Sequence, residues 1–309
     1  MQFPRLSEAM RLARLEPPAG RVTMVLDTDT YNEVDDQFAV TYALLSPEKL
    51  TVEAIYAAPF FNDRSTGPAD GMEKSYQEIL RLLDLLGKPA DGRVFRGSTT
   101  YLPDWDHPVE SPAALDLIER AMRRSPGDEP LFVVAIGAIT NVASAILLEP
   151  RIIERVVVVW LGGHAFFWPD TREFNLMQDV PAARVIFDSG VPLVQLPCMG
   201  VVSHLHTTVA ELERYVQGRS RIGDYLTDIV RSYQGNPFAW SKVIWDISSI
   251  AYLIDAGWTP SALVHSPIVT DDLTWSFDSR RHFIRSAYSI DRDAIFRDLF
   301  TRLAQAGAK

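Results

Sequence analysis

Short apolar runs alternate along this chain with longer segments that are apolar on one side only. The apolar runs predict buried strands at 21–26, 50–60, 93–97, 130–137, 155–163 and 191–197. The segments between them have apolar residues at helical spacing and predict helices at 34–45, 71–87, 113–124, 140–148 and 180–190. Apolar strands separated by helices are typical of a mostly parallel sheet covered on both faces. We therefore expect an α/β fold with a doubly wound sheet flanked by helices.

The C-terminal part of the chain follows a different pattern. Residues 208–256 are mainly helical in periodicity, and the segments 268–278 and 280–291 predict a β-hairpin before a last helix that begins at residue 292. No linker, repeat or low-complexity segment interrupts the chain. We expect a single domain over residues 21–309, preceded by an N-terminal extension at 1–20.

The charge of the chain limits its partners. It has 309 residues with 40 acidic and 30 basic side chains, a formal net charge of −10, and no basic run. Such a field repels polyanions, so we expect no nucleic acid and no anionic membrane as partner, and a small neutral or cationic molecule fits better. The sequence leaves a homo-oligomer open.

The N-terminal segment and the cysteine content lead us to expect a cytoplasmic protein. The first twenty residues interleave charged and apolar positions, unlike a secretion signal, and no stretch approaches the roughly 18 apolar residues of a membrane span. Cys198 is the only cysteine and lies in an apolar segment. A single cysteine cannot form an intrachain disulfide or a cysteine-based zinc cluster, and we expect its thiol to be buried.

Five acids follow the first predicted strand within ten positions, in "DTDTYNEVDD" (27–36). In a doubly wound sheet, ligands bind beyond the carboxyl ends of the strands, where these acids should lie. Two like unit charges 4 Å apart cost about 4 kcal/mol at an effective dielectric constant of 20, so converging carboxylates require a cation. Because no histidine or cysteine is near in sequence, a hard ion, calcium or magnesium, fits better than zinc.

Other interpretations of this segment remain open. The acids can form a solvated loop before a capped helix, with no ligand. The aspartyl-phosphate loop of haloacid-dehalogenase-like phosphatases also places two acids two positions apart, but Tyr31 stands where that loop needs threonine or valine. An EF-hand is excluded because its glycine and its final glutamate are missing.

With its acids placed, the chain from about residue 21 onward resembles the inosine-uridine-preferring nucleoside hydrolase family. The first strand of that family ends in Asp-x-Asp, followed shortly by Asp-Asp. Three later segments are similar to family motifs in the same order: "AIGAITNVA" (135–143), "REFNLMQD" (172–179) and "WDISSIAYLIDAG" (245–257). Each motif stands beside the end of a predicted strand or helix.

The resemblance implies a metal site and a ribose site. It implies that calcium is bound by the carboxylates and the carbonyl of Asp29, Asp36, Asp246 and Ile136. It also implies Asp29 as the general base. The residues implied for the ribose are Asp35, Glu173, Asn175 and, after the second strand, Asn62. Asp27 is expected to brace the loop.

Two residues bear on the leaving base. The resemblance implies a purine preference, because Trp245 stands where pyrimidine-tolerant members carry a histidine that protonates the base. His164 follows a glycine pair at a strand end, where it could reach the site or could be a loop histidine with no role.

The chain departs from the family pattern in two loops. Its acidic loop is two residues longer between the acid pairs, lacks the usual Pro-Gly and adds Glu33, and the loop at 162–175 lacks a Gly-Asn before Glu-Phe-Asn. Despite these departures, the resemblance implies a calcium-dependent enzyme that hydrolyses the N-glycosidic bond of ribonucleosides and releases base and ribose. The alternative is a non-catalytic or specialised protein that binds ribosyl compounds and keeps the metal and sugar site.

Overall fold

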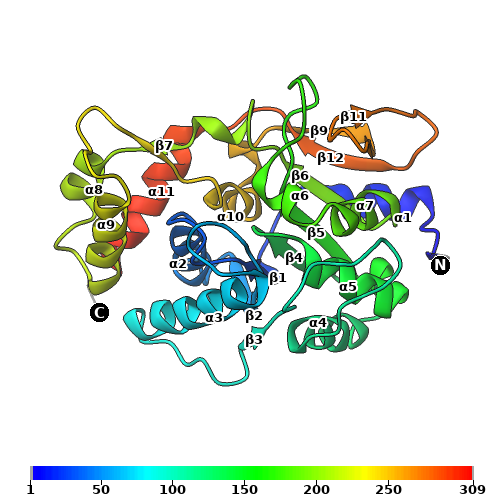
Figure 1. The fold of residues 1–309 in the computed structure, drawn as a ribbon, viewed down its shortest axis with the longest axis horizontal. Helices are drawn as coiled ribbons and strands as arrows, with labels where there is room; N and C mark the ends of the chain where they lie inside the picture. The colour runs from blue at the N-terminus through cyan, green and yellow to red at the C-terminus, as the bar shows by residue number, and fades with distance from the viewer. Residues whose placement is uncertain (1–2, 308–309) are drawn as a thin grey trace.

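Eight strands form one central sheet in the computed structural model, which describes residues 3–307 (Figure 1). The strand order is β3-β2-β1-β4-β5-β6-β12-β9. The strands are β1 (Val22–Thr28), β2 (Leu50–Ala57), β3 (Val94–Arg96), β4 (Leu131–Ala135), β5 (Val156–Leu161), β6 (Leu193–Leu196), β9 (Ser261–His265) and β12 (Phe283–Ala287). Every neighbouring pair is parallel except β12–β9 at one edge. The predicted fold class, a mostly parallel doubly wound sheet, is confirmed.

Helices cover both faces of the sheet because the strands are apolar on both faces. On β1, Met24 and Leu26 belong to one hydrophobic core and Val25 to the other. The first core is closed by α2 (Asp36–Leu44), α3 (Pro68–Leu85), α8 (Val209–Tyr215), α9 (Arg221–Tyr233), α10 (Ile247–Ile254) and α11 (Arg292–Gln305). The second is closed by α4 (Pro112–Met122), α5 (Thr140–Leu148) and α7 (Val180–Asp188), which follows the short helix α6 (Phe174–Gln178).

Helices α8, α9 and α11 lie together at the end of the molecule opposite the β9–β12 edge (Figure 1). The connections also contain short 3₁₀ helices at Pro150–Glu154, Val202–His204 and Ala256–Trp258. None of the helices within residues 3–307 is both long and apolar enough to cross a membrane.

The predicted hairpin between 268–278 and 280–291 is wrong. The hairpin forms within the first segment instead, where β10 (Ile268–Val269) pairs with β11 (Trp275–Ser276). A turn between Thr270 and Thr274 reverses the chain there: the amide of Thr270 donates to the carbonyl of Thr274, and their hydroxyls are 2.8 Å apart. The second segment supplies β12, whose antiparallel partner is β9. A further small sheet joins β7 (His206–Thr207) and β8 (Lys242–Val243).

The first twenty residues contain a helix, α1 (Glu8–Leu15), which packs on β12. Leu15 is fully buried, and its carbonyl oxygen accepts a 2.6 Å hydrogen bond from Nε of Arg285 on β12. Ser7 caps the helix by accepting from the amide of Met10. Residues 3–20 are therefore attached to the body of the protein.

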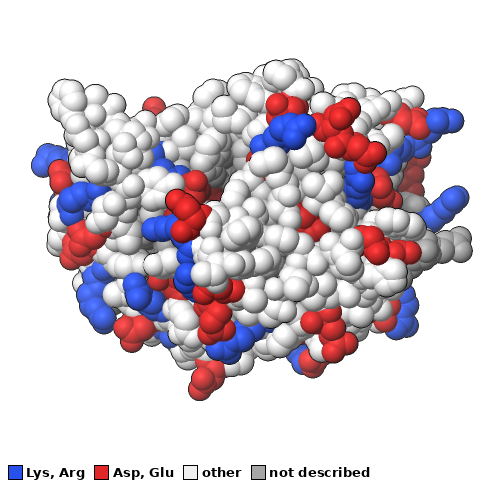
Figure 2. All heavy atoms as spheres, viewed as in Figure 1, with Lys and Arg blue, Asp and Glu red and all other residues white. Residues whose placement is uncertain are grey.

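Charged side chains of both signs are interleaved on the face shown in Figure 2. Red and blue groups alternate along its lower edge and at its right-hand end, while its centre is mostly uncharged. On this face, acidic and basic side chains therefore lie next to one another and do not form separate patches.

The strand order places a ligand crevice next to β1. The chain runs from β1 through β2 to β3 on one side, and then returns to add β4 on the other side of β1. At such a switch point the loops after the two strands diverge and leave a crevice at their carboxyl ends. The acidic segment follows β1, and Ile136 and Gly137 follow β4.

The attachment of α1 can be tested by truncating its buried side chain. We expect Leu15→Ala to lower the free energy of unfolding by about 2–5 kcal/mol, because it leaves a cavity between α1 and the sheet. Urea denaturation measures the change. Leu115→Ala is the control: Leu115 is 46% exposed on α4, so its loss should stay within about 0.5 kcal/mol. Equal effects of the two variants would contradict the packing of α1 on the core.

Candidate active site

A cavity of about 230 Å³ lies beyond the carboxyl ends of the central strands. Its wall combines carboxylates, amides, one imidazole and several apolar side chains. The lining residues are Asn32, Glu33, Asp35, Ile136, Leu161, His164, Arg172, Glu173, Phe174, Asn175, Cys198, Met199, Trp245 and Asp246. Seven of the residues predicted from the sequence line this cavity: Asp35, Ile136, His164, Glu173, Asn175, Trp245 and Asp246.

The alternation of β1 directs its last side chains to opposite faces of the sheet. Asp27 is fully buried on the α5 side, where its Oδ1 accepts a 2.8 Å hydrogen bond from Nδ2 of Asn141. Thr28 points to the α2 side and donates a 2.6 Å hydrogen bond to Oδ1 of Asp36. Asp27 does not line the cavity, and its contact braces the end of β1 against α5. Burial raises the pKa of Asp27 to about 7.

Asp29 and Asp36 lie fully buried behind the cavity wall. Neither carboxylate oxygen of Asp29 has a hydrogen-bond partner among the residues the structure describes, and the same holds for Oδ2 of Asp36. Burial, followed by the charge of Asp36, raises the pKa of Asp29 well above its usual value. Burial and the charge of Asp35 raise the pKa of Asp36 to about 7. Buried carboxylates without partners are costly, so these oxygens call for a cation.

Gly137 makes room for the Asp29 carboxylate. A Cβ atom at this position would stand 2.9 Å from both Cγ and Oδ1 of Asp29, closer than real side chains approach. The residue after Ile136 must therefore be glycine for Asp29 to keep its place beside the end of β4.

Three carboxylates converge at the base of the cavity. Asp35, Asp36 and Asp246 each offer an oxygen, and these atoms all lie within 4.8 Å of one another. All three side chains are buried. Burial, with the charges of Asp35, Asp36 and Asp29 after it, raises the pKa of Asp246 well above its usual value. This acidic cluster can bind a metal ion.

A buried lysine neutralises one side of the cluster. Nζ of Lys242 forms ion pairs with Glu33 and, at 3.5 Å, with Oδ1 of Asp35. Oδ2 of Asp35 accepts a 3.1 Å hydrogen bond from the amide of Trp245. Asp35 is thus partnered on both oxygens, whereas no lysine or arginine within residues 3–307 forms an ion pair with Asp29, Asp36 or Asp246.

The long acidic loop is also tied down by Arg64. Its guanidinium donates to the carbonyl oxygens of Tyr31 at 3.2 Å and Glu33 at 2.6 Å, and it lies over the ring of Tyr31. The ammonium of Lys242 lies over the ring of Tyr233 at the end of α9. The contacts of Arg64 and Lys242 hold the part of the acidic loop around Tyr31 and Glu33 against the region around α9 and β8.

Glu173 and Asn175 are set by the start of α6. The Glu173 carboxylate caps this helix, accepting from the amides of Asn175 and Leu176, and also accepts from the amide of Gly163 at 2.9 Å. Nδ2 of Asn175 donates a 3.0 Å hydrogen bond to the carbonyl of Leu161, at the end of β5. Glu173 therefore holds the helix start and β5 together, and Asn175 occupies the cavity wall beside it.

His164 and Trp245 provide the aromatic part of the wall. Nδ1 of His164 accepts a 3.3 Å hydrogen bond from the amide of Met199, so the neutral ring carries its proton on Nε2. Burial lowers the pKa of His164, which keeps the ring neutral at physiological pH. Trp245 precedes Asp246 and is partly buried. A hydrogen-bond donor and an indole therefore share this cavity.

Asn62 lies apart from the other predicted residues. It does not line the cavity: its Nδ2 donates to the carbonyl of Asn32 at 3.1 Å, and its Oδ1 accepts from the amide of Arg64. Asn32 lines the cavity in its place. Cys198 is buried, as expected, and forms part of the cavity wall.

Sequence reasoning missed Lys242, Asn141 and Gly137. Lys242 is 209 positions from its partner Glu33, and a lone lysine in a helical region carries no local signal. Asn141 and Gly137 lie inside the motif at 135–143. That motif was used only to predict the Ile136 carbonyl as a ligand, although it also contains these two residues.

Comparison with known proteins identifies the family. A family model described as inosine-uridine preferring nucleoside hydrolase matches residues 24–296. The chain belongs to this family. The predicted resemblance is confirmed, and the protein is a nucleoside hydrolase.

Relatives of this nucleoside hydrolase differ in their named specificities. The pyrimidine-specific ribonucleoside hydrolase RihA of Klebsiella pneumoniae (strain 342) is 31% identical over 231 residues, which cover 67% of this chain and 68% of that protein. The structure of a purine-preferring ribonucleoside hydrolase from Gardnerella vaginalis matches with a TM-score of 0.74 at 21% identity, covering 93% of this chain and 100% of that one. The plant nucleoside hydrolase PpNRh1 matches with a TM-score of 0.73 at 21% identity, covering 92% and 99%. At these identities the two structures show the shared fold alone.

The contact between Gly137 and Asp29 gives a sharp test of the site in this nucleoside hydrolase. We expect Gly137→Ala to lower kcat for nucleoside hydrolysis about ten-fold or more, because the added methyl group displaces the Asp29 carboxylate. Gly127→Ala is the control, since a Cβ there meets no atom within 4 Å. Steady-state kinetics on a panel of ribonucleosides measures both. Unchanged turnover in the folded Gly137→Ala protein would show that catalysis does not need Asp29 in this position.

Proposed function

We propose that this nucleoside hydrolase is calcium-dependent and prefers purine ribonucleosides. The observation that carries the proposal is the set of buried carboxylates beneath the cavity, whose oxygens lack a counter-charge. Asp29, Asp36 and Asp246 are the members that no lysine or arginine of the described chain pairs with. The cavity above them has a few polar side chains that converge on it, as expected of a small-molecule site.

The donor set fits a calcium ion. Asp29, Asp36, Asp246 and the carbonyl oxygen of Ile136 would hold it, because calcium takes six to eight oxygen ligands and accepts both carboxylates and carbonyls. Asp35 is a weaker candidate for a ligand, since Lys242 and the Trp245 amide already occupy its two oxygens. A bound calcium ion would supply Lewis acidity toward a water molecule and the ribose hydroxyls.

Asp29 is proposed as the general base. Both of its oxygens are free of hydrogen bonds, so one can accept a proton from the attacking water. Cleavage of the N-glycosidic bond passes through an oxocarbenium-like state, and the surrounding carboxylates favour its positive charge.

The ribose is proposed to lie between Asp35 and Asn175. The ion pair of Asp35 with Lys242 and its bond to the Trp245 amide fix the carboxylate in one orientation at the cavity wall. Asn175 is oriented on the opposite element by its bond to Leu161. Glu173 already accepts three backbone amides, and its main contribution is to hold Asn175 in place. Asn62 is left out of this proposal because its polar atoms serve the acidic loop.

Trp245 supports the preference for purines. A leaving base must be protonated or must have its basicity raised, and the only imidazole in the cavity wall, His164, is kept neutral by burial and is therefore a poor acid. An indole face can stack on a purine and favour protonation of N7 by solvent, and a pyrimidine has no N7. The RihA relatives are named pyrimidine-specific, so the preference proposed for this chain differs from theirs.

The calcium site can be tested without measuring activity. We expect calcium at about 100 times its Kd to stabilise the protein by about 2.7 kcal/mol, since it binds the folded state. Asp36→Asn should lose most of this gain, whereas Asp84→Asn, an exposed surface change, should keep it. Thermal melts with calcium and with a chelator measure the difference. If melting of the wild type is insensitive to both, the metal site is refuted.

The base preference can be tested on paired substrates. We expect inosine to be hydrolysed faster than uridine, and Trp245→Ala to slow inosine roughly two- to ten-fold more than p-nitrophenyl riboside, whose leaving group needs no help. Trp105→Ala is the control, because Trp105 is 55% exposed and does not line the cavity. Ratios of kcat/KM measure the effect. Uridine turnover equal to that of inosine, or equal slowing of the two leaving groups, would refute stacking as the source of preference.

A further inference from the structure

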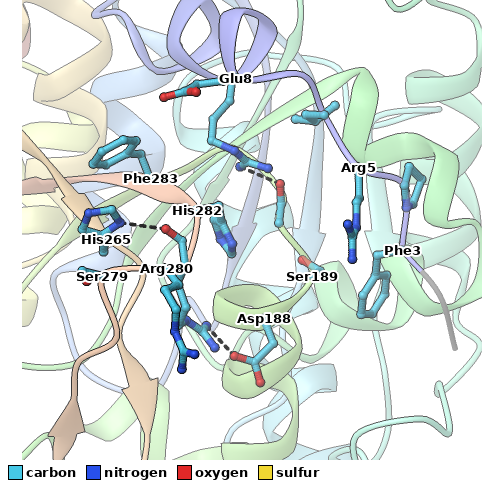
Figure 3. A pocket seen from close by; sticks show the side chains of 15 residues that line it. Phe3, Arg5, Glu8, Asp188, Ser189, His265, Ser279, Arg280, His282 and Phe283 are labelled. Carbon is cyan, nitrogen blue, oxygen red and sulfur yellow. Dashed lines mark hydrogen bonds and ion pairs between the residues drawn. The ribbon is translucent and has the colours of Figure 1, made fainter.

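A second cavity, of about 770 Å³, lies between the start of α1 and the β9–β12 edge of the sheet (Figure 3). Its charged wall is basic, although the protein as a whole is acidic. The charged residues that line it are Arg5, Glu8, Arg11, Asp188, Arg280 and Arg281, with His265 and His282 beside them. None of these residues belongs to the active-site cavity.

Arg11 is the central residue of this basic cavity. Its side chain is buried, with 7% of the residue exposed, and its Nη1 donates a 2.8 Å hydrogen bond to the carbonyl of Gly190. Within residues 3–307 no carboxylate forms an ion pair with it. Burial lowers the pKa of its guanidinium, with no carboxylate opposing the change. A buried cation without a counter-ion is costly and invites an anion.

The other basic groups divide into paired and unpaired ones. Arg281 is held by Asp188 at 2.6 Å and by the carbonyls of Phe187 and Ser266. Arg280 is paired with Asp278, which does not line the cavity. These two arginines therefore build the wall, and their charges are already balanced.

Two further groups in the wall lack partners among residues 3–307. Arg5 is exposed and forms no ion pair with any carboxylate in the described part of the chain. Nε2 of His282 is buried without a hydrogen-bond partner among described residues, and Figure 3 shows the ring among the side chains that line the cavity. Burial and the charges of Arg11 and Arg281 lower the pKa of His282 to about 3, so its ring is neutral and Nε2 can donate a hydrogen bond.

We propose that this cavity binds the phosphate group of a small metabolite, with Arg11 and Arg5 supplying the charge and His282 a hydrogen bond. Guanidinium groups bind phosphate oxygens through two parallel hydrogen bonds, and donors on different sides suit a tetrahedral dianion better than a planar carboxylate. Phe3, Phe283 and His265 line the same cavity, and His265 stacks on Phe283 with ring centroids 4.4 Å apart. They offer an apolar surface to the organic part of the ligand.

Calorimetric titration tests the proposal with defined probes. Inorganic phosphate, phenyl phosphate and acetate are titrated into the full chain in the presence of a chelator, which removes calcium from the acidic cluster. None of these probes contains ribose, so the result is independent of the hydrolase function proposed above. We expect phosphate and phenyl phosphate to bind, with acetate at least about ten-fold weaker because it carries a single charge and is planar.

Substitutions locate the site. Arg11→Gln and Arg5→Gln should each weaken phosphate binding about ten-fold, since each removes a charge-assisted contact. Arg14→Gln is the matched control on the same helix: its guanidinium bonds to the carbonyl of Pro126, away from the cavity, and its Kd should equal that of the wild type. If Arg11→Gln does not fold, the exposed Arg5→Gln decides the test.

The proposal is overturned by any of three results. These are no phosphate binding up to about 10 mM, a range that includes weak metabolite sites, acetate binding as tight as phosphate, or unchanged phosphate affinity in Arg5→Gln and in folded Arg11→Gln. Tighter binding of phenyl phosphate than of inorganic phosphate, lost in Phe283→Ala, would support an organic phosphate as the ligand. Equal binding of the two would support phosphate alone.

Discussion

The mutual repulsion of buried carboxylates at the end of β1 is the constraint on which the site depends. Asp29, Asp36 and Asp246 are withdrawn from water, and their pKa values are raised by burial and by the charges of neighbouring carboxylates, including Asp35. A fold that lacked a cation here would have to protonate them or expose them. The surrounding structure keeps them buried: Thr28 orients Asp36, and Gly137 leaves room for Asp29. Keeping these carboxylates out of water costs stability, and a bound cation would offset that cost.

Much of the fold could be predicted from the sequence, because the spacing of apolar residues within each segment indicates whether it forms a strand or a helix. The strands β4 and β5 are buried on both faces and appear in the sequence as unbroken apolar runs. The β9–β12 pairing could not be predicted in the same way. The strand β9 is short and partly exposed, and its partner β12 begins about twenty positions later. The segment between them forms a separate hairpin, which turns between Thr270 and Thr274.

The residues of the candidate site likewise fall into those that could be predicted from the sequence and those that could not. Residues next to strand or helix ends, such as Asp29, Asp246 and Glu173, could be placed because an element boundary fixes where they point. Asn62 could not, since its position depends on how the acidic loop folds back on the segment after β2. Lys242 could not be predicted for a related reason, because only the tertiary structure brings it next to its partner Glu33. Contacts between loops carry no periodic signal, and they decide the details of the pocket.

The ion pair between Lys242 and Glu33 limits the order in which the long acidic loop could have arisen. A lysine at position 242 is accommodated by Asp35 alone, 3.5 Å away, so it could appear before any insertion. A glutamate at position 33 without that lysine would add one more negative charge beside carboxylates that already repel one another. An ancestor is therefore expected to have gained the lysine first or both residues together, and descendants that lose the lysine should lose the glutamate as well.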